Sequence, residues 1–322
     1  MAEIVLGIGS SHSPMLSTPH EAFAGHRERD QQRVPEFAAL ARDRAARLEP
    51  ELAPAVTAAR HTANQAALAR LSKILAEAAL DTLVVIGDDQ GEWFSVDSQP
   101  ALCIYWGESV DSLPPPVERM APSLRLGYWG YYGDGASRTY PVDAALGRHL
   151  IESLTRDHAF DVAHMRVQPR HAPLGHAWSF VHQRLMDAGT RVIPLVPVLL
   201  NTYYPPNQPT PARCYQLGRA LRQAIEGWPV SRRIGVLASG GLSHFVVDEA
   251  LDRHVLEILA KRDADAVAAL PLDRLNSGNS EIRNWIAAAG ALEGLDMHVL
   301  DYVPCYRSEA GTGCGMAFAV WD

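Results

Sequence analysis

Three stretches of this sequence, "VVIG", "VIPLVPVLL" and "IGVLAS", are apolar at almost every position. A strand with one face in water would alternate apolar and polar residues, so uniform runs indicate a sheet that is covered on both faces. Alanine-rich amphipathic segments, which are typical of helices, lie between the runs. We therefore predict an α/β fold with a mostly buried central sheet and helices on both of its faces.

The same patterning predicts the order of the elements. Strands are expected at residues 3–9, 82–87, 101–106, 191–200, 234–239, 298–302 and 316–321, and helices at about residues 31–47, 61–79, 142–155, 212–226, 249–269 and 280–289. Pro194 and Pro197 fall inside one expected strand, which indicates that it is irregular or lies near an edge. Two segments rich in Pro, Gly or aromatic residues, 108–141 and 201–212, are expected as loop excursions around a pocket. No internal repeat or low-complexity linker interrupts the chain, so we predict one domain over residues 1–322.

Composition and missing motifs narrow the class of protein. The 322 residues carry a formal charge of −8, which argues against nucleic acid or an anionic membrane surface as the main partner. No run approaches the roughly 20 apolar residues that cross a bilayer, and the N-terminal segment lacks the pattern of a signal peptide. The four cysteines are scattered without a CxxC pair, which favours a reducing cytoplasm. A dinucleotide fingerprint, a phosphate-binding P-loop and a GxSxG elbow are all absent, so nucleotide enzymes and serine hydrolases are poor candidates.

Four histidines stand at the ends of expected elements. His12 follows the first strand in "GIGSSHSPM", His61 opens an expected helix in "RHTANQAALARL", His176 lies in "APLGHAWSF", and His244 ends "VLASGGLSH". Each of them alone is more often a hydrogen-bonded structural histidine than a functional one. Three of the four, however, lie in turns bounded by Gly or Pro beside apolar runs, where ligands bind in open α/β sheets. This joint pattern indicates metal or acid–base chemistry.

A metal site of this kind also needs a carboxylate. Two imidazoles and one carboxylate form a facial triad that leaves positions open, an arrangement used for Fe(II) and O₂ chemistry. The candidate carboxylates are Asp88, Asp89, Glu249 and Glu281. Each also has a structural interpretation, as a polar strand end or as an acid in the first turn of a helix. Spacing alone does not choose between them.

The sequence resembles the class III extradiol ring-cleavage dioxygenases, in particular the catalytic β subunit of protocatechuate 4,5-dioxygenase and the related gallate dioxygenases. The resemblance is carried by six blocks in family order: "SSHSP", "RHTAN", "VVIGDDQ", "PLGHAWS", "ASGGLSH" and "SEIRNWIAAAGAL". Together they span most of the chain from residue 4 to about residue 292. One departure is that Asp88-Asp89-Gln90 stands where the family often shows Asn-Asp-His.

The resemblance implies a role for each residue of the site. It makes His12, His61 and Glu281 the ligands of Fe(II), His244 the catalytic acid–base, and His176 a second active-site histidine. The substrates it implies are a small aromatic diol (protocatechuate, gallate, 3-O-methylgallate or a related catechol) and O₂. Aromatic side chains such as Trp178 and the tyrosines near residue 130 would suit a flat ring, although core packing explains each of them equally well.

The assembly and two other functions stay open in the sequence. We expect a homodimer, in which either the chain closes its own pocket or a small accessory subunit closes it. The alternatives to a dioxygenase are a zinc hydrolase or lyase that uses the same ligands, and a non-catalytic member of the family. The presence of His12, His61, His244 and Glu281 together argues against the non-catalytic alternative.

Overall fold

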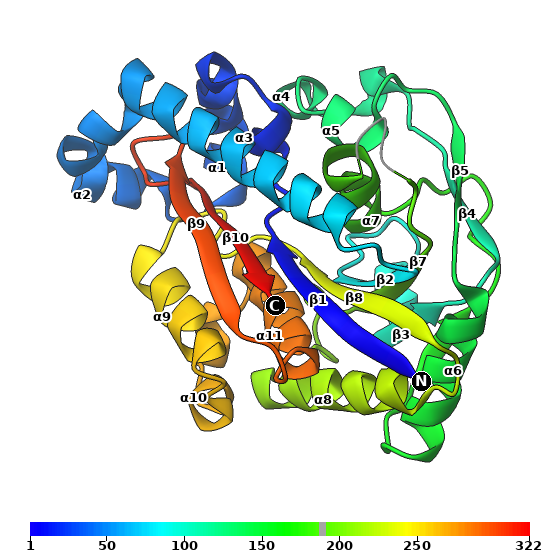
Figure 1. Ribbon diagram of the computed structural model, residues 1–322. Coiled ribbons are helices and arrows are strands. Elements are labelled where there is room, and N and C mark those ends of the chain that lie inside the picture. The colour runs from blue at the N-terminus through cyan, green and yellow to red at the C-terminus, as the bar shows by residue number, and fades with distance from the viewer. Residues whose placement is uncertain (187–190) are drawn as a thin grey trace.

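A computed structural model describes residues 1–186 and 191–322, and its centre is one eight-stranded sheet in the order β6-β3-β7-β2-β8-β1-β10-β9 (Figure 1). The strands of this sheet are β1 (Ala2–Ser10), β2 (Thr82–Gly87), β3 (Leu102–Tyr105), β6 (Ala163–Met165), β7 (Leu195–Leu200), β8 (Arg232–Ser239), β9 (Met297–Tyr306) and β10 (Gly313–Trp321). A separate two-stranded sheet pairs β4 (Ser109–Ser112) with β5 (Arg138–Pro141). The molecule is a single α/β domain, as the apolar runs predicted.

The direction of the central strands determines where a site can form. Strands β7, β2, β8 and β1 are neighbours and run parallel, while β10 is antiparallel to β1 and β3 is antiparallel to β7. The carboxyl ends of β1, β2 and β8 therefore meet at one edge of the sheet. In open α/β sheets this edge is where ligands bind.

Helices cover both faces of the sheet. The helices are α1 (Arg27–Arg33), α2 (Phe37–Leu48), α3 (Pro54–Glu77), α4 (Pro122–Arg125), α5 (Trp129–Tyr132), α6 (Ala144–Arg156), α7 (His176–Phe180), α8 (Pro211–Gly227), α9 (Glu249–Ala260), α10 (Ala264–Ala268) and α11 (Ile282–Ala291). One core contains residues of α6, α8, α9 and α11, and a second core on the opposite face contains residues of α3, α5 and α7 (Figure 1). No helix in the described part of the chain combines the length and apolar character needed to cross a membrane.

The structure differs from the sequence-based expectation in several elements. The expected strand with two prolines is neither irregular at Pro197 nor at an edge: β7 begins after Pro194 and lies inside the sheet, where Pro197 pairs in register with Val85. The helix expected at residues 31–47 is divided into α1 and α2, with Pro35 between them. The helix expected at 249–269 is divided into α9 and α10, near Arg262 with its positive φ of 57°. Strands β4, β5 and β6 were not predicted.

A close contact between α11 and β1 brings two distant segments together. A Cβ atom at Gly9 would lie 2.4 Å from the Trp285 ring, so only glycine lets the helix approach the strand this closely. Trp285 is fully buried, and its indole donates a hydrogen bond to the carbonyl of Gly240 at 2.8 Å. This packing places the start of α11 beside the end of β1, where the site lies.

Candidate metal centre and active site

A pocket of about 390 Å³ lies at the carboxyl edge of the parallel strands. His12 follows β1, Gln90 follows β2 and His244 follows β8, and all three line the pocket. Glu281 reaches the same pocket from the last position of the 3₁₀ turn η8 (Ser277–Glu281), directly before α11. The ends of three strands and the start of one helix thus converge on one place.

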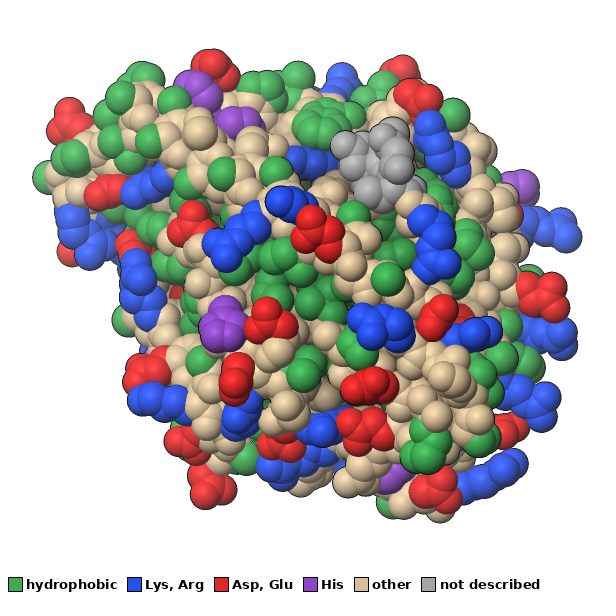
Figure 2. Space-filling view, in the orientation of Figure 1, with side chains coloured by type: hydrophobic (Ala, Val, Ile, Leu, Met, Phe, Trp, Pro, Cys, Tyr) green, Lys and Arg blue, Asp and Glu red, His purple; other side chains and the backbone are tan. Residues whose placement is uncertain are grey.

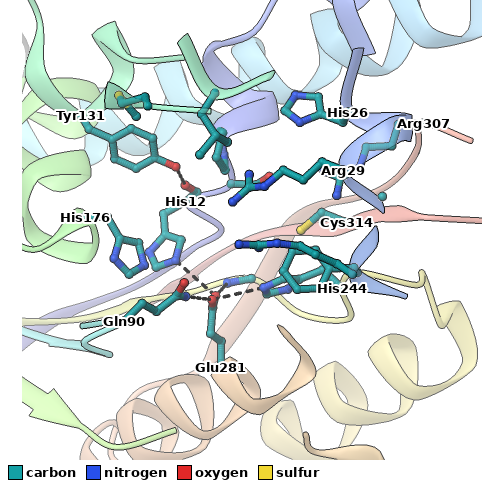
Figure 3. Close-up of a pocket in the computed structure, with 18 of the residues that line it drawn as sticks. His12, His26, Arg29, Gln90, Tyr131, His176, His244, Glu281, Arg307 and Cys314 are labelled. Carbon is teal, nitrogen blue, oxygen red and sulfur yellow. Dashed lines mark hydrogen bonds and ion pairs between the residues drawn. The ribbon is translucent and has the colours of Figure 1, made fainter. Parts of the chain in front are cut away.

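Four side chains in this place could hold a metal ion. Donor atoms of His12, Asp88, His176 and Glu281 all lie within 4.8 Å of one another. His12, Asp88 and Glu281 are buried, and Figure 3 shows the rings of His12 and His176 next to each other above Glu281. Imidazole nitrogens and carboxylate oxygens are suitable ligands for Fe(II), Zn(II) and related divalent metals.

Hydrogen bonds fix which nitrogen of His12 is available. The Ser239 hydroxyl donates its one proton to the carbonyl of Ala177 at 2.7 Å. It therefore accepts from His12 Nδ1, 3.0 Å away, and a neutral His12 carries its lone pair on Nε2. That nitrogen faces Glu281 Oε2 at 3.2 Å. Because two acceptors face each other there, the pair needs a cation between them, which is the arrangement of a metal site.

The other two histidines are held in the same way. His176 Nδ1 pairs with Glu92 at 2.5 Å, and His244 Nδ1 donates to the carbonyl of Leu242 at 2.9 Å. His244 Nε2 faces Glu281 Oε1 at 3.2 Å. His176 Nε2 is buried and has no hydrogen-bond partner in the described chain. All three rings are therefore held through Nδ1, which leaves Nε2 as the nitrogen that could bind a metal. Metal-binding proteins commonly fix their histidine ligands in this way.

Burial and the neighbouring charges act in opposite directions on the pKa of Glu281. Burial alone would raise the pKa of this carboxyl group, but His244 and His12 outweigh burial and hold the pKa well below its usual range. Burial would likewise lower the pKa of His244, whereas Glu281 raises it well above its usual value. The side chain of Glu281 also accepts a hydrogen bond from the backbone N–H of Gly241 at 2.6 Å. An ionised Glu281 is thus the stable form at neutral pH.

Glu92 favours a positive charge on His176. Burial acts to lower the pKa of His176, yet the contact with Glu92 raises it to about 10. The pKa of Glu92 falls to about 2 because His176 outweighs the effect of burial. The carboxylate that fixes Nδ1 therefore also stabilises a cation, either a proton or a metal, at Nε2.

An amide joins the two buried carboxylates of the cluster. Gln90 Nε2 donates to Asp88 Oδ2 at 3.1 Å and to Glu281 Oε1 at 3.0 Å. Asn284 also donates to Asp88, at 3.2 Å. Asp88 is completely buried, and burial together with the charge of Glu281 raises its pKa. Gln90 thus separates two carboxylates that would otherwise repel each other.

Apolar and aromatic side chains form one part of the remaining wall of the pocket. They include Met120, Leu124, Tyr131, Tyr132 and Phe245, of which the first four belong to the excursion at 108–141. The Tyr131 hydroxyl donates to the carbonyl of His12 at 2.5 Å (Figure 3). No residue of the other excursion, 201–212, is among the described residues that line this pocket. An aromatic ring could be held between these side chains.

Comparison with known proteins identifies the family. Over residues 50–311 the chain matches the catalytic LigB subunit of aromatic ring-opening dioxygenase. The chain belongs to this family. It is also similar to the gallate dioxygenase of Pseudomonas putida, with 36% identity over 107 residues. That stretch covers 33% of this chain and 30% of the relative, so the chain aligns with less than a third of that enzyme's length.

The region that matches the family, residues 50–311, contains Asp88, His176, His244 and Glu281. His12 lies before this region. The structure nevertheless brings His12 together with these residues. Of the five residues expected to meet in one crevice, His12, His176, His244 and Glu281 do so and His61 does not.

His61 does not join them. It was expected to open a helix and to bind the metal, but α3 begins at Pro54, so His61 lies in the second turn of that helix. Its ring packs near those of His20 and Phe23, with centroids 6.2 and 6.3 Å away. Within the described chain, His61 is neither in the donor cluster nor on the wall of this pocket. In the described chain, the donors that lie beside His12 and Glu281 are those of His176 and Asp88.

Three other candidates have structural roles, which the sequence had left open for each of them. Trp178 is completely buried, and its indole donates to the carbonyl of Val85 at 3.1 Å, so it packs in the core and not against a substrate. Glu249 accepts from the Tyr306 hydroxyl at 2.7 Å, away from the donor cluster. Asp89 accepts from the backbone N–H of Trp93 at 2.8 Å and holds the loop after β2.

Gln90 was named in the sequence only as part of a departure from the family pattern, and Glu92 was not predicted at all. Gln90 had a signal, because it follows an apolar strand at the edge where His12 was expected. Glu92 had none, since its distance from His176 in the sequence is large and its own surroundings are polar.

Proposed function

We propose that this chain is an Fe(II)-dependent extradiol dioxygenase that opens the ring of a catechol-type substrate. The observation that carries the proposal is the convergence of the donors of His12, His176, Glu281 and Asp88, with both imidazoles fixed through Nδ1. Family membership supports the aromatic ring-opening chemistry. Two imidazoles and a carboxylate support Fe(II), because this donor set leaves coordination positions open for substrate and O₂.

His12, His176 and Glu281 would hold the metal, with Asp88 behind them. When bound, Fe(II) supplies the redox chemistry that lets O₂ react with the ring. Burial of Glu281 and Asp88 keeps water from these carboxylates and strengthens their attraction for a cation. Ser239 and Glu92 keep the two rings in the orientation that offers Nε2.

His244 is suited to move a proton of the substrate. A catechol must give up at least one hydroxyl proton to chelate a metal through both oxygens. His244 lines the pocket with Nε2 turned inward, and its Nδ1 is held by a backbone carbonyl. Its position is further fixed by Gly278, because a Cβ atom at that residue would lie 2.2 Å from the His244 ring. We propose His244 as the acid–base residue.

The experiment is anaerobic loading with Fe(II), followed by O₂ consumption against protocatechuate, gallate, 3-O-methylgallate and catechol. We expect O₂ uptake in equal amounts to the ring-opened product, which is yellow. The matched control is the same protein loaded with Zn(II), which cannot supply the redox step. Absence of O₂ uptake with every catechol at full Fe(II) occupancy would overturn the proposal.

The fourth donor favours one second candidate, a zinc-dependent hydrolase or lyase. Four donors within 4.8 Å match the coordination number of zinc, which is usually tetrahedral. The same assay separates the two functions, because a hydrolase would be active with Zn(II) and would consume no O₂.

A further inference from the structure

The pocket separates charge more sharply than the surface does. On the face seen in Figure 2, acidic and basic side chains are interspersed. Inside the pocket, the carboxylates Glu92 and Glu281 lie with the histidines, whereas Arg29, Arg33 and Arg307 line another part of the wall. Two of these arginines come from α1, and the third follows β9. In Figure 3, Arg29 extends toward the middle of the pocket from the side that carries His26 and Arg307.

Arg307 already has an ion-pair partner within the chain. Its guanidinium makes two hydrogen bonds of 2.7 Å with Asp30, a carboxylate that is almost completely buried. Asp30 also accepts from the Thr312 hydroxyl at 2.6 Å. This bidentate ion pair connects α1 to the β9–β10 hairpin, so Arg307 and Asp30 have a structural role.

Arg29 has no such partner. Its guanidinium group makes no hydrogen bond or ion pair with any residue in the described part of the chain, although the residue is partly buried. Burial, together with the charges of Arg33 and Arg307, lowers its pKa to about 10. Arg33 lies over the ring of Phe245, 5.3 Å from its centroid, and within the described chain it also forms no ion pair. Two guanidinium groups therefore line the pocket without a matching carboxylate.

The carboxylates of the pocket form no ion pair with Arg29 or Arg33, because histidines already pair with them. Glu281 is paired with His12 and His244, and Glu92 is paired with His176. A guanidinium that is partly desolvated and unpaired is unfavourable unless an anion reaches it. The planar guanidinium group matches a carboxylate through two parallel hydrogen bonds. We therefore expect the ligand to carry the negative charge that pairs with these guanidinium groups.

We propose that Arg29, assisted by Arg33, binds a carboxylate substituent of the aromatic substrate while the ring hydroxyls face the histidines. The proposal rests on the proposed function and deepens it, because it names the residue that selects acidic over neutral catechols. His26 supports it: the residue is buried on the same wall and its Nε2 has no partner in the described chain, so it is a further donor or acceptor for the substituent.

The test compares Arg29→Gln with the wild type on two catechols substituted at the same ring position, protocatechuate and 4-methylcatechol. The wild type should favour the acid. In Arg29→Gln the KM for protocatechuate should rise about 10–100-fold, the usual range for a lost charge-assisted hydrogen bond. Its kcat and the KM for 4-methylcatechol should change by less than about twofold, because the proposal gives Arg29 no contact with the reacting part of the ring. Arg29→Lys should recover part of the loss.

Arg70→Gln is the matched control. Arg70 is exposed on α3 and does not line the pocket, and the substitution changes the net charge by the same amount. It should leave both KM values unchanged. A wild type without preference for the acid, or an Arg29→Gln variant that loses both substrates equally, would overturn the proposal.

Anaerobic binding to the Fe(II)-loaded protein separates this proposal from the proposed function. Calorimetry with protocatechuate and 4-methylcatechol measures affinity without turnover. Tighter binding of the acid that depends on Arg29, without O₂ uptake after air is admitted, would retain the subsite and refute the dioxygenase. Turnover of both catechols with equal KM would do the reverse.

Discussion

The two ends of the pocket differ in how their charged side chains are paired. At the metal end, each carboxylate faces donors from the chain itself: Glu281 meets His12, His244, Gln90 and the backbone of Gly241. At the other end, Arg29 and Arg33 face no carboxylate of the described chain except the one that Arg307 already occupies.

The difference also lies in the elements that carry the residues. Metal-end residues follow buried parallel strands or precede a buried helix, so their positions are fixed by the core. Arginine-end residues come mainly from α1, a seven-residue helix held by the Asp30–Arg307 pair. A fixed end suits a metal that tolerates little movement, and a more peripheral end suits the part of a substrate that varies.

The largest expected effect is at Glu281. Glu281→Ala removes the carboxylate that faces two imidazoles, and metal affinity should fall by more than the 10–100-fold typical of residues behind the ligands. Metal content after dialysis and turnover should both be lost, while the circular dichroism spectrum stays native. His61→Ala is the matched control and should keep both metal and turnover. Metal loss in His61→Ala with retention in Glu281→Ala would show that the ligand set is wrong.

The next effect is at His244. His244→Gln should retain metal but reduce kcat by roughly 10²–10⁴-fold, the usual contribution of a positioned acid–base. Metal analysis and rates are to be measured on the same preparation. A variant that turns over normally would remove His244 from the acid–base role.

Gln90 tests the metal end in two directions. Gln90→Ala removes the amide that orients Asp88 and Glu281, and metal affinity should fall about tenfold. Gln90→His places a further imidazole beside Glu281, as the family often shows, and should increase affinity by a similar factor. Titration with Co(II), followed by its visible spectrum, measures both variants. Unchanged affinity in both would remove Gln90 from the site.

The smallest effect on catalysis is expected at His26, at the arginine end of the pocket, where the prediction concerns the stability of the fold. Burial, followed by the charge of Arg307, lowers its pKa to about 4, although Asp30 opposes this and Arg29 adds to it. An unfolded chain binds a proton here as the pH falls through about 6.5, before the folded chain does. Stability is therefore present above pH 6.5 and is lost as the pH falls toward 4, by up to about 3 kcal/mol. Urea unfolding at pH 7 and pH 4.5 should show a smaller loss for His26→Gln than for the wild type, and equal losses would contradict this.

The sequence predicted the central sheet well because its strands are bounded by clear signals. "TLVVIG" ends at two aspartates, and β2 occupies the predicted residues 82–87. Strands β4 and β5 could not be predicted, since their residues lie among turn-forming and aromatic neighbours and pair only with each other. The interior position of Pro197 was also hidden, because it depends on which partner each edge of β7 meets.

The candidate site was predictable where it follows strand ends and unpredictable where it depends on helix phase. His12 and His244 follow β1 and β8, so their convergence results from the parallel sheet. His61 was expected at the start of a helix, whereas α3 begins seven residues earlier and His61 lies outside the donor cluster of the described chain. The Pro54 signal for the helix start was present in the sequence. The pairing of Glu92 with His176 depends on tertiary packing and leaves no local pattern.

The position of β1 between β8 and β10 has a consequence for synthesis. On a ribosome that adds 5–20 residues per second, β1 emerges on the order of 10–45 s before its partner strand β8. Its other neighbour in the described sheet, β10, is made later still, so β1 has neither of its partner strands during this interval. Glu281 is made later still. The donor cluster of His12, Asp88, His176 and Glu281 is therefore incomplete until most of the chain has been made. A chaperone that shields this apolar strand would be expected to increase the yield of folded protein.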